Sequence, residues 1–228
     1  SAVSGMIYRM KQNAVGLAKK QEANSKALSQ VQAEIRANKE GYNTYMAQAD
    51  RVGLSASYAE KVRNGSLAIE SITDENLSEK IKSYEEWYKK ARDCEKAIRD
   101  LEEQERDLAL ERLDNISDYF DSLIDVNKSL QDMNDAKLEL NDKMGFSNAD
   151  SKTKDIINSS IRAEEAKYAD LAKKLSDYQA EFNDLVKKGY LTKGSLDYME
   201  SLNTINEFNE ELLESASALV ELQDKLRE

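Results

Sequence analysis

The segment from Ile7 to Val52 decides the fold class, and it reads IYRMKQNAVGLAKKQEANSKALSQVQAEIRANKEGYNTYMAQADRV. Side chains at alternating spacings of three and four residues are apolar along this segment, with Gln21, Asn24 and Asn38 as the polar exceptions. Such a heptad pattern places one stripe of a helix against a partner helix and leaves its other faces in water. The stripe consists of Ile7, Met10, Ala14, Leu17, Gln21, Asn24, Leu28, Val31, Ile35, Asn38, Tyr42, Tyr45, Ala49 and Val52.

Composition extends this interpretation to the whole chain, because none of its 228 residues is proline. An average usage near 5% would give roughly eleven prolines. Proline removes a backbone donor and clashes with the preceding helical turn, so its absence is what long uninterrupted helices require. With 34% charged and 40% hydrophobic residues, we expect thin helical layers with a wet surface rather than one thick core.

The first helix is predicted over about residues 6–52, where Gly53 occupies the position typical of a glycine that ends a helix. Gly16 and Gly41 lie inside this helix, and each costs ~1 kcal/mol relative to alanine. Of the three polar stripe residues, Asn24 and Asn38 either fix the alignment of neighbouring helices or face solvent at a bundle edge, as does Asn209 further along.

A short helix and a much longer one follow. Ser55 is expected to cap the short helix over about residues 55–63, which ends at Asn64-Gly65. The longer helix, capped by Thr73 or Asp74, runs from about residue 74 to about residue 144. At ~1.5 Å per residue, some seventy residues form a rod of roughly 105 Å.

The apolar stripe of this long helix changes register between Leu101 and Leu113. Glu105 and Arg112 fall on the continued stripe, and apolar residues resume one position later. We expect either a stagger at this point or a handover from one partner helix to another.

Two further helices are predicted over about residues 151–188 and 195–228. Gly189 and Gly194 bracket the turn between them, and Ser195 caps the second. Glu164 is the only carboxylate on the apolar stripe of the helix predicted over residues 151–188. We expect it at an exposed edge of the bundle. The expected stripe of the last helix is Tyr198, Leu202, Ile205, Asn209, Leu212, Ala216, Leu219, Gln223 and Leu226.

Short connections make successive helices antiparallel neighbours. The sequence therefore predicts an all-α, elongated antiparallel coiled coil or helical bundle of long helices, in which the longest helix is a spine shared by two domains. Residues 1–112 are expected to form a helical hairpin unit from the first helix, the short helix and the first half of the spine. Residues 113–228 are expected to form a three-helix bundle.

Catalytic chemistry has little support in the sequence. Histidine is absent, Cys94 is the single cysteine, and no phosphate loop or serine elbow occurs. We expect Cys94 to act as a small hydrophobic residue and Trp87 to pack where the connector meets the long helix. The prediction is therefore a non-enzymatic protein without catalytic, cofactor-binding or metal-binding residues and without cofactors.

Charge and hydropathy restrict the partners. The net charge of −11 argues against nucleic-acid binding, which needs a basic face. No apolar run approaches the ~20 residues that span a bilayer, so we expect no membrane insertion by this segment. Because Ser1 is not an initiator methionine and the chain stops inside a helical pattern at Glu228, we expect a piece of a longer protein.

Two stretches resemble a known family. Residues 52–98 read VGLSASYAEKVRNGSLAIESITDENLSEKIKSYEEWYKKARDCEKAI, and residues 189–201 read GYLTKGSLDYMES, continued over residues 202–228 by LNTINEFNEELLESASALVELQDKLRE. Both resemble the central helical region of tail tape measure proteins from long-tailed bacteriophages and prophages of Firmicutes hosts. The similarity lies in the GLS turn, the NGSL connector with ITDE, the spacing from Trp87-Tyr88 to Cys94, and the GY…GS…Y…IN pattern.

The resemblance implies a virion structural protein whose length sets the length of the tail tube and which occupies the tube lumen. Implied partners are tail tube subunits, other tail assembly proteins or further copies of the chain. The implied location is the phage tail, and the host bacterial cytoplasm during assembly. A spectrin-like scaffold or adaptor and a secreted helical effector are the alternatives, because both have the same heptads.

Overall fold

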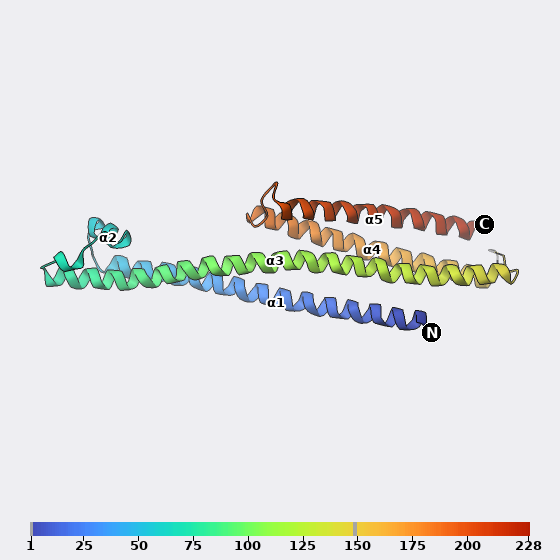
Figure 1. The fold of residues 1–228 in the computed structure, drawn as a ribbon, viewed down its shortest axis with the longest axis horizontal. Coiled ribbons are helices and arrows are strands. Elements are labelled where there is room, and N and C mark those ends of the chain that lie inside the picture. Colours follow the sequence, from blue (N-terminus) through green and yellow to red (C-terminus); the bar gives the residue numbers. More distant parts are fainter. Residues whose placement is uncertain (1, 148–149) are drawn as a thin grey trace. The chain divides into compact units, whose positions relative to one another are not determined.

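The computed structural model of the chain describes residues 2–147 and 150–228, apart from the side chains of residues 2–4, 6 and 7. Within these ranges the chain folds into long helices without any strand, so the predicted all-α helical bundle is confirmed (Figure 1). The side chain of the predicted stripe residue Ile7 and the loop residues 148 and 149 lie outside what is described. The helices are α1 (Ala2–Arg51), α2 (Ala56–Arg63), α3 (Glu75–Lys143), α4 (Ser151–Lys187) and α5 (Leu196–Arg227), with a 3-10 turn at Ile69–Ser71 in the connector.

The helix boundaries follow local capping chemistry. The side chains of Ser55, Asp74 and Ser195 accept hydrogen bonds from backbone N–H groups three residues ahead, at 3.4, 3.2 and 3.2 Å. Each satisfies an N–H that has no partner within its helix. Gly53, with φ of 79°, adopts the left-handed conformation after α1. The predicted caps are therefore confirmed, with Asp74 rather than Thr73 capping α3.

The chain divides into two compact units, and α1 and α3 each contribute to both. Residues 26–108 form one unit, while residues 109–228 and the N-terminal residues up to Ser25 form the other. On α3 the division falls between Leu108 and Ala109, inside the predicted change of register. On α1 it differs from the predicted domains, because α1 is long enough to supply a partner to both parts of α3.

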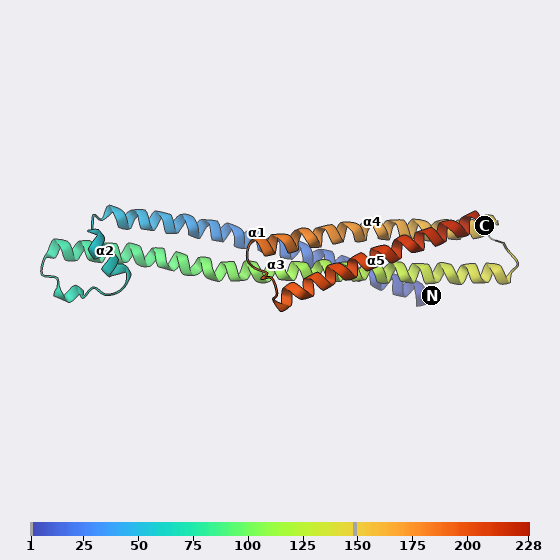
Figure 2. The same cartoon turned by 90° about the horizontal axis from the view of Figure 1, so that it is seen from above.

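The unit of residues 109–228 thus contains four helical segments rather than the predicted three. In Figures 1 and 2, α4 runs back along α3 and α5 returns beside them. The segment of α1 before Ser25 lies along the same part of α3. There the Ser129 hydroxyl donates a hydrogen bond to Met10 Sδ at 3.6 Å. The sequence pattern does not separate this segment, because its apolar stripe is continuous with the rest of α1.

The main core of this unit lies where α3, α4 and α5 meet. Its centre is Phe208, whose ring stacks on Phe120 with centroids 3.6 Å apart and meets the edge of Tyr178 at 5.5 Å. Aromatic side chains of this size dominate the apolar area that a small core buries. The buried members are Ala109, Leu113, Ile116, Phe120, Leu171, Leu175, Tyr178, Phe182, Leu185, Leu191 and Phe208.

The stripe predicted for α5 is wrong at two of its nine positions, while the other seven are half-buried. Asn209 and Gln223, which were placed on it, are exposed. The buried residues recur every seven positions instead, and the half-buried Ile205, Leu212 and Leu219 lie between them. Small serines let the neighbouring helix approach closely, whereas a search for apolar residues alone passes over them. The buried residues are Ser201, Phe208, Ser215 and Leu222.

The unit of residues 26–108 has two smaller cores, around Val31, Ile35 and Leu101 and around Ala49, Ala59 and Tyr84. Trp87 packs against the second core, as predicted, and stacks on Tyr45 with centroids 6.1 Å apart. The Arg63 guanidinium donates a 3.0 Å hydrogen bond to the Tyr84 hydroxyl, which ties the end of α2 to α3.

The glycine inside α1 at position 41 has a packing reason. A Cβ at Gly41 would lie 3.2 Å from Cys94 Sγ, so the missing side chain makes room for the half-buried thiol of α3. This agrees with the expected role of Cys94 as a small hydrophobic residue.

Candidate functional site: a buried polar layer between α3, α4 and α5

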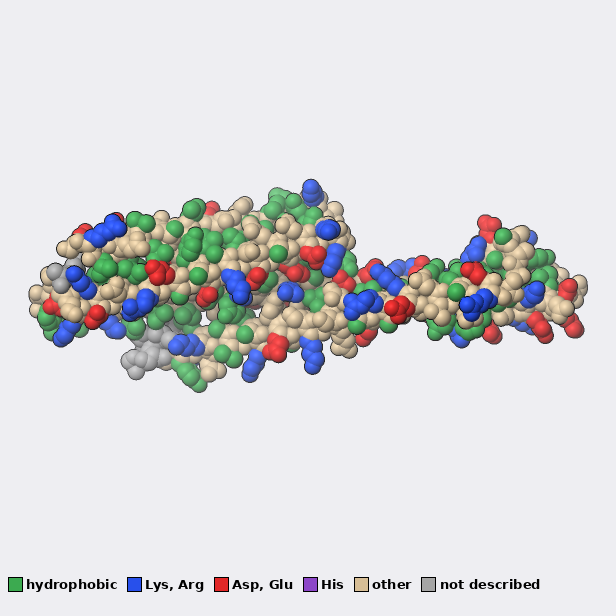
Figure 3. All heavy atoms as spheres, turned by 180° about the vertical axis from the view of Figure 1, so that it is seen from behind, with side chains coloured by type: hydrophobic (Ala, Val, Ile, Leu, Met, Phe, Trp, Pro, Cys, Tyr) green, Lys and Arg blue, Asp and Glu red, His purple; other side chains and the backbone are tan. Residues whose placement is uncertain are grey.

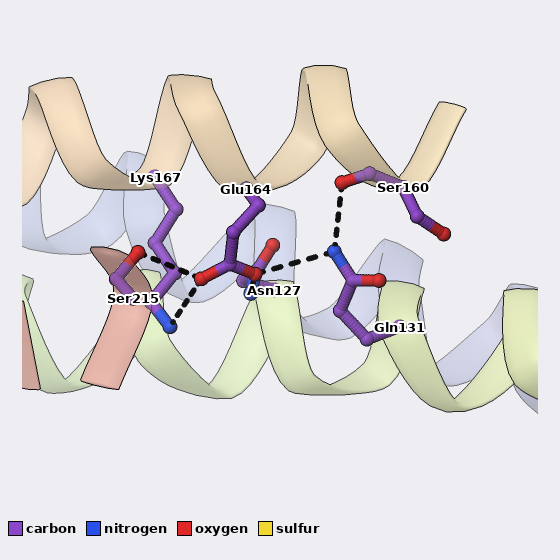
Figure 4. Close-up of polar contacts among 6 residues, drawn as sticks. All are labelled: Asn127, Gln131, Ser160, Glu164, Lys167 and Ser215. Atoms are coloured by element: carbon purple, nitrogen blue, oxygen red, sulfur yellow. Dashed lines mark hydrogen bonds and ion pairs between the residues drawn. The ribbon is translucent and has the colours of Figure 1, made fainter. Parts of the chain in front are cut away.

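The most unusual feature of the bundle is a buried carboxylate at the middle of α4. Glu164 is 2% exposed. Its Oε2 accepts hydrogen bonds from Asn127 Nδ2 at 2.8 Å and Gln131 Nε2 at 3.3 Å, both on α3 (Figure 4). Its Oε1 accepts from the Ser215 hydroxyl of α5 at 2.7 Å and from Lys167 Nζ of α4 at 3.2 Å. We call these five residues the Glu164 layer.

The prediction that Glu164 lies at an exposed edge of the bundle is therefore wrong. An isolated carboxylate cannot be buried at acceptable cost, so a sequence interpretation that considers α4 alone places it in water. The donors that make burial possible come from positions 37 residues earlier, on α3, and 51 residues later, on α5.

Further polar pairs continue from the layer along the α3–α4 contact. Asn134 Nδ2 donates to the Ser160 hydroxyl at 2.8 Å, and Asn141 Nδ2 lies 3.4 Å from the Thr153 hydroxyl. Asn127, Asn134 and Asn141 are spaced by seven residues, so they lie on one face of α3 and meet α4 in antiparallel register. This spacing was present in the sequence, and it is the signal that could have located the site.

The layer determines alignment more than it adds stability. A net hydrogen bond contributes only ~1 kcal/mol, whereas a buried donor or acceptor left without a partner costs ~1–3 kcal/mol. Sliding α4 or α5 by one turn would separate Glu164 from its donors, so one register is strongly favoured over its neighbours. Buried polar residues have this effect in coiled coils, where they fix register at some cost in stability.

The chemistry of the layer leaves little room for a ligand. A carboxylate has about four acceptor sites, and four protein donors already occupy those of Glu164. Across the described residues, no group of three or more His, Cys, Asp or Glu side chains is arranged to hold a metal ion. The arrangement supports a role in holding helices together.

The hydropathy of the helices and the similarity of the chain to known proteins add two findings. No helix in the described part of the chain combines the length and the apolar character needed to cross a membrane. Comparison with known proteins found no matching family model, no matching curated protein and no matching solved structure.

Proposed function

We propose that this chain is a segment of a phage tail tape measure protein and acts there as a helical spacer. The observation that carries the proposal is the resemblance of residues 52–98 and 189–201 to the central region of that family. The fold supports it, since the chain consists almost entirely of helices, the longest being α3 (Glu75–Lys143).

A helix is suited to measuring length because it converts residue count into distance at a fixed rise of ~1.5 Å per residue. Where α4 and α5 fold back on α3, however, the same residues add less length. The Glu164 layer holds these helices in one register, so the segment either opens inside the tube or contributes a bundle of constant length. Tail tube subunits and other tail assembly proteins are the proposed partners, in the virion and in the host cytoplasm during assembly.

The negative charge of the chain agrees with this role. A protein that occupies the tube lumen shares it with DNA that must pass later, and a net charge of −11 disfavours capture of phosphate.

Deletion within the intact phage gene tests the proposal. Removing four whole heptads from the matching region should shorten the tail by ~42 Å if those residues lie along the axis as a single helix, and by less if they fold back. The matched control replaces the same residues by an unrelated heptad helix of equal length, which should restore the tail length. Electron micrographs of purified virions provide the measurement. Normal tail length and infectivity after deletion would reject the spacer role and favour a scaffold or an effector.

A further inference from the structure

The outer face of α5 exposes apolar side chains in a regular row. Met199, Leu213 and Val220 are 55%, 70% and 57% exposed, and they are spaced by multiples of seven residues along one side of the helix. The polar Asn206 occupies the fourth position of this seven-residue spacing, and a glutamate follows each of the four positions, at Glu200, Glu207, Glu214 and Glu221. Hydrophobic and charged side chains are mixed over the surface of this unit in Figure 3. We call the outer side of α5 that includes Met199, Leu213, Val220 and the adjacent glutamates the α5 face.

Acidic residues of α3 add to the negative charge beside the α5 face. Burial, then the neighbouring Asp118 and Glu200, raises the pKa of Asp114. Burial, then Asp118, Asp125 and Glu207, raises the pKa of Asp121. The carboxylates of the two helices therefore lie close enough to repel one another, and a cationic partner would relieve that repulsion.

The first part of α1 exposes a face of the opposite charge in the same unit. Tyr8 and Val15 are 64% and 52% exposed and lie seven residues apart. The exposed Lys11 and Lys19 flank them on the same side of the helix. We call this surface the α1 face.

We propose that the α1 face of one copy of this chain binds the α5 face of a second copy. The equal spacing of seven residues lets Tyr8 and Val15 pack on Leu213 and Val220 in one register, with lysines beside the glutamate row. Pairing of two α5 faces would set one glutamate row against another, so the contact between unlike faces is favoured.

Such a contact joins copies head to tail. When two copies bind, one keeps a free α5 face and the other keeps a free α1 face, so association produces either a ring or an open chain rather than a closed pair. The contact area between one α1 face and one α5 face is small, and its charges are exposed. We therefore expect a dissociation constant on the order of tens of micromolar, and binding that weakens as the salt concentration rises.

Charge reversal with complementation tests the proposal. One variant carries Lys11→Glu with Lys19→Glu, and the other carries Glu207→Lys with Glu214→Lys. All four side chains are exposed, so both variants should fold, which circular dichroism verifies. The control, Lys128→Glu with Lys137→Glu, makes the same charge change as the first variant at exposed positions of α3.

Sedimentation velocity of the 228-residue chain at low ionic strength gives the readout. Wild type and control should associate to the same extent. Each variant alone should have a dissociation constant at least tenfold higher, which corresponds to a loss of about 1.4 kcal/mol of binding free energy. An equimolar mixture of the two variants should associate again, because the α5 face of the first variant is complementary to the α1 face of the second, and the reversed α1 face of the first is complementary to the reversed α5 face of the second. A wild type that stays monomeric at the highest concentration, or a mixture that does not associate, would overturn the proposal.

Discussion

A single side chain, Glu164, illustrates how much one residue can decide. Its carboxylate connects α3, α4 and α5 through Asn127, Lys167 and Ser215. Asn127 and Ser215 are themselves buried, and Lys167 is half-buried. Removing the carboxylate therefore affects several groups at once.

Replacing Glu164 by alanine should lower the free energy of unfolding by about 2–4 kcal/mol, because buried donors on three helices lose their acceptor. Urea unfolding followed by circular dichroism measures the change. The adjacent Glu165 is exposed, so Glu165→Ala should remain within about 0.5 kcal/mol of wild type. Equal midpoints for the two variants would show that the layer adds nothing to stability.

Gly41 is a residue at which helix propensity and packing oppose each other. Alanine is ~1 kcal/mol better than glycine inside a helix, but a Cβ there would meet Cys94 Sγ at 3.2 Å. Gly41→Ala should therefore yield less than the full gain in the wild-type background and about 0.5–1 kcal/mol in a Cys94→Ala background. A double-mutant cycle of urea midpoints measures the coupling, and simple additivity would contradict the proposed contact.

Among the elements, α5 shows how a helix can present two different stripes. One stripe contains Phe208 and Leu222 and faces the core, and the other contains Leu213 and Val220 and faces outward. Periodicity alone cannot rank two stripes on one helix, because both repeat every seven residues. The ranking depends on where α3 and α4 lie.

The corrected stripe of α5 predicts opposite outcomes for neighbouring residues. Phe208 is 2% exposed and packs on Phe120 and Tyr178, so Phe208→Ala should lower the free energy of unfolding by about 3–5 kcal/mol. Asn209→Ala, at an exposed position that sequence periodicity placed on the stripe, should change it by less than about 0.5 kcal/mol. Chemical denaturation of the two variants decides between the stripes, and a larger loss for Asn209→Ala would restore the original one.

For the molecule as a whole, the dominant electrostatic property is its excess of acid, with 44 acidic against 33 basic residues. Several of the acidic residues lie close together where α3 and α5 meet. There, burial and neighbouring carboxylates raise the pKa of Asp114, Asp121 and Glu211 above their ordinary values of 3.8, 3.8 and 4.5. A carboxyl group with a raised pKa binds its proton more tightly in the folded state than in the unfolded state. It therefore destabilises the fold at neutral pH, and the penalty disappears as the pH falls through the raised pKa.

The pH dependence follows from that sign. A variant with Asp114→Asn and Asp121→Asn should melt at a higher temperature than wild type at pH 7. The difference should shrink as the pH falls through the raised pKa of the two wild-type carboxyl groups and below the ordinary aspartate pKa of 3.8, because these groups then become protonated. Thermal unfolding across this range provides the measurement. A difference in melting temperature that stays constant at every pH would mean that the folded state does not raise the pKa of these two carboxyl groups.

The sequence by itself determined the helices and their ends. Proline is absent, the heptads run for tens of residues, and caps such as Ser55 and Ser195 lie next to the N–H groups that they satisfy. These interactions join residues at most a few positions apart, so a linear pattern contains all the information that they need.

Only the tertiary structure decided which faces are covered. The burial of Glu164, the choice of Phe208 over Asn209 and the division of α1 after Ser25 depend on side chains that are distant in the chain. The cost of burying a polar group depends on whether a partner meets it, and the heptads of α4 do not record that Asn127 and Ser215 face Glu164. Local physics therefore determined which segments are helical, and contacts between helices determined how they align.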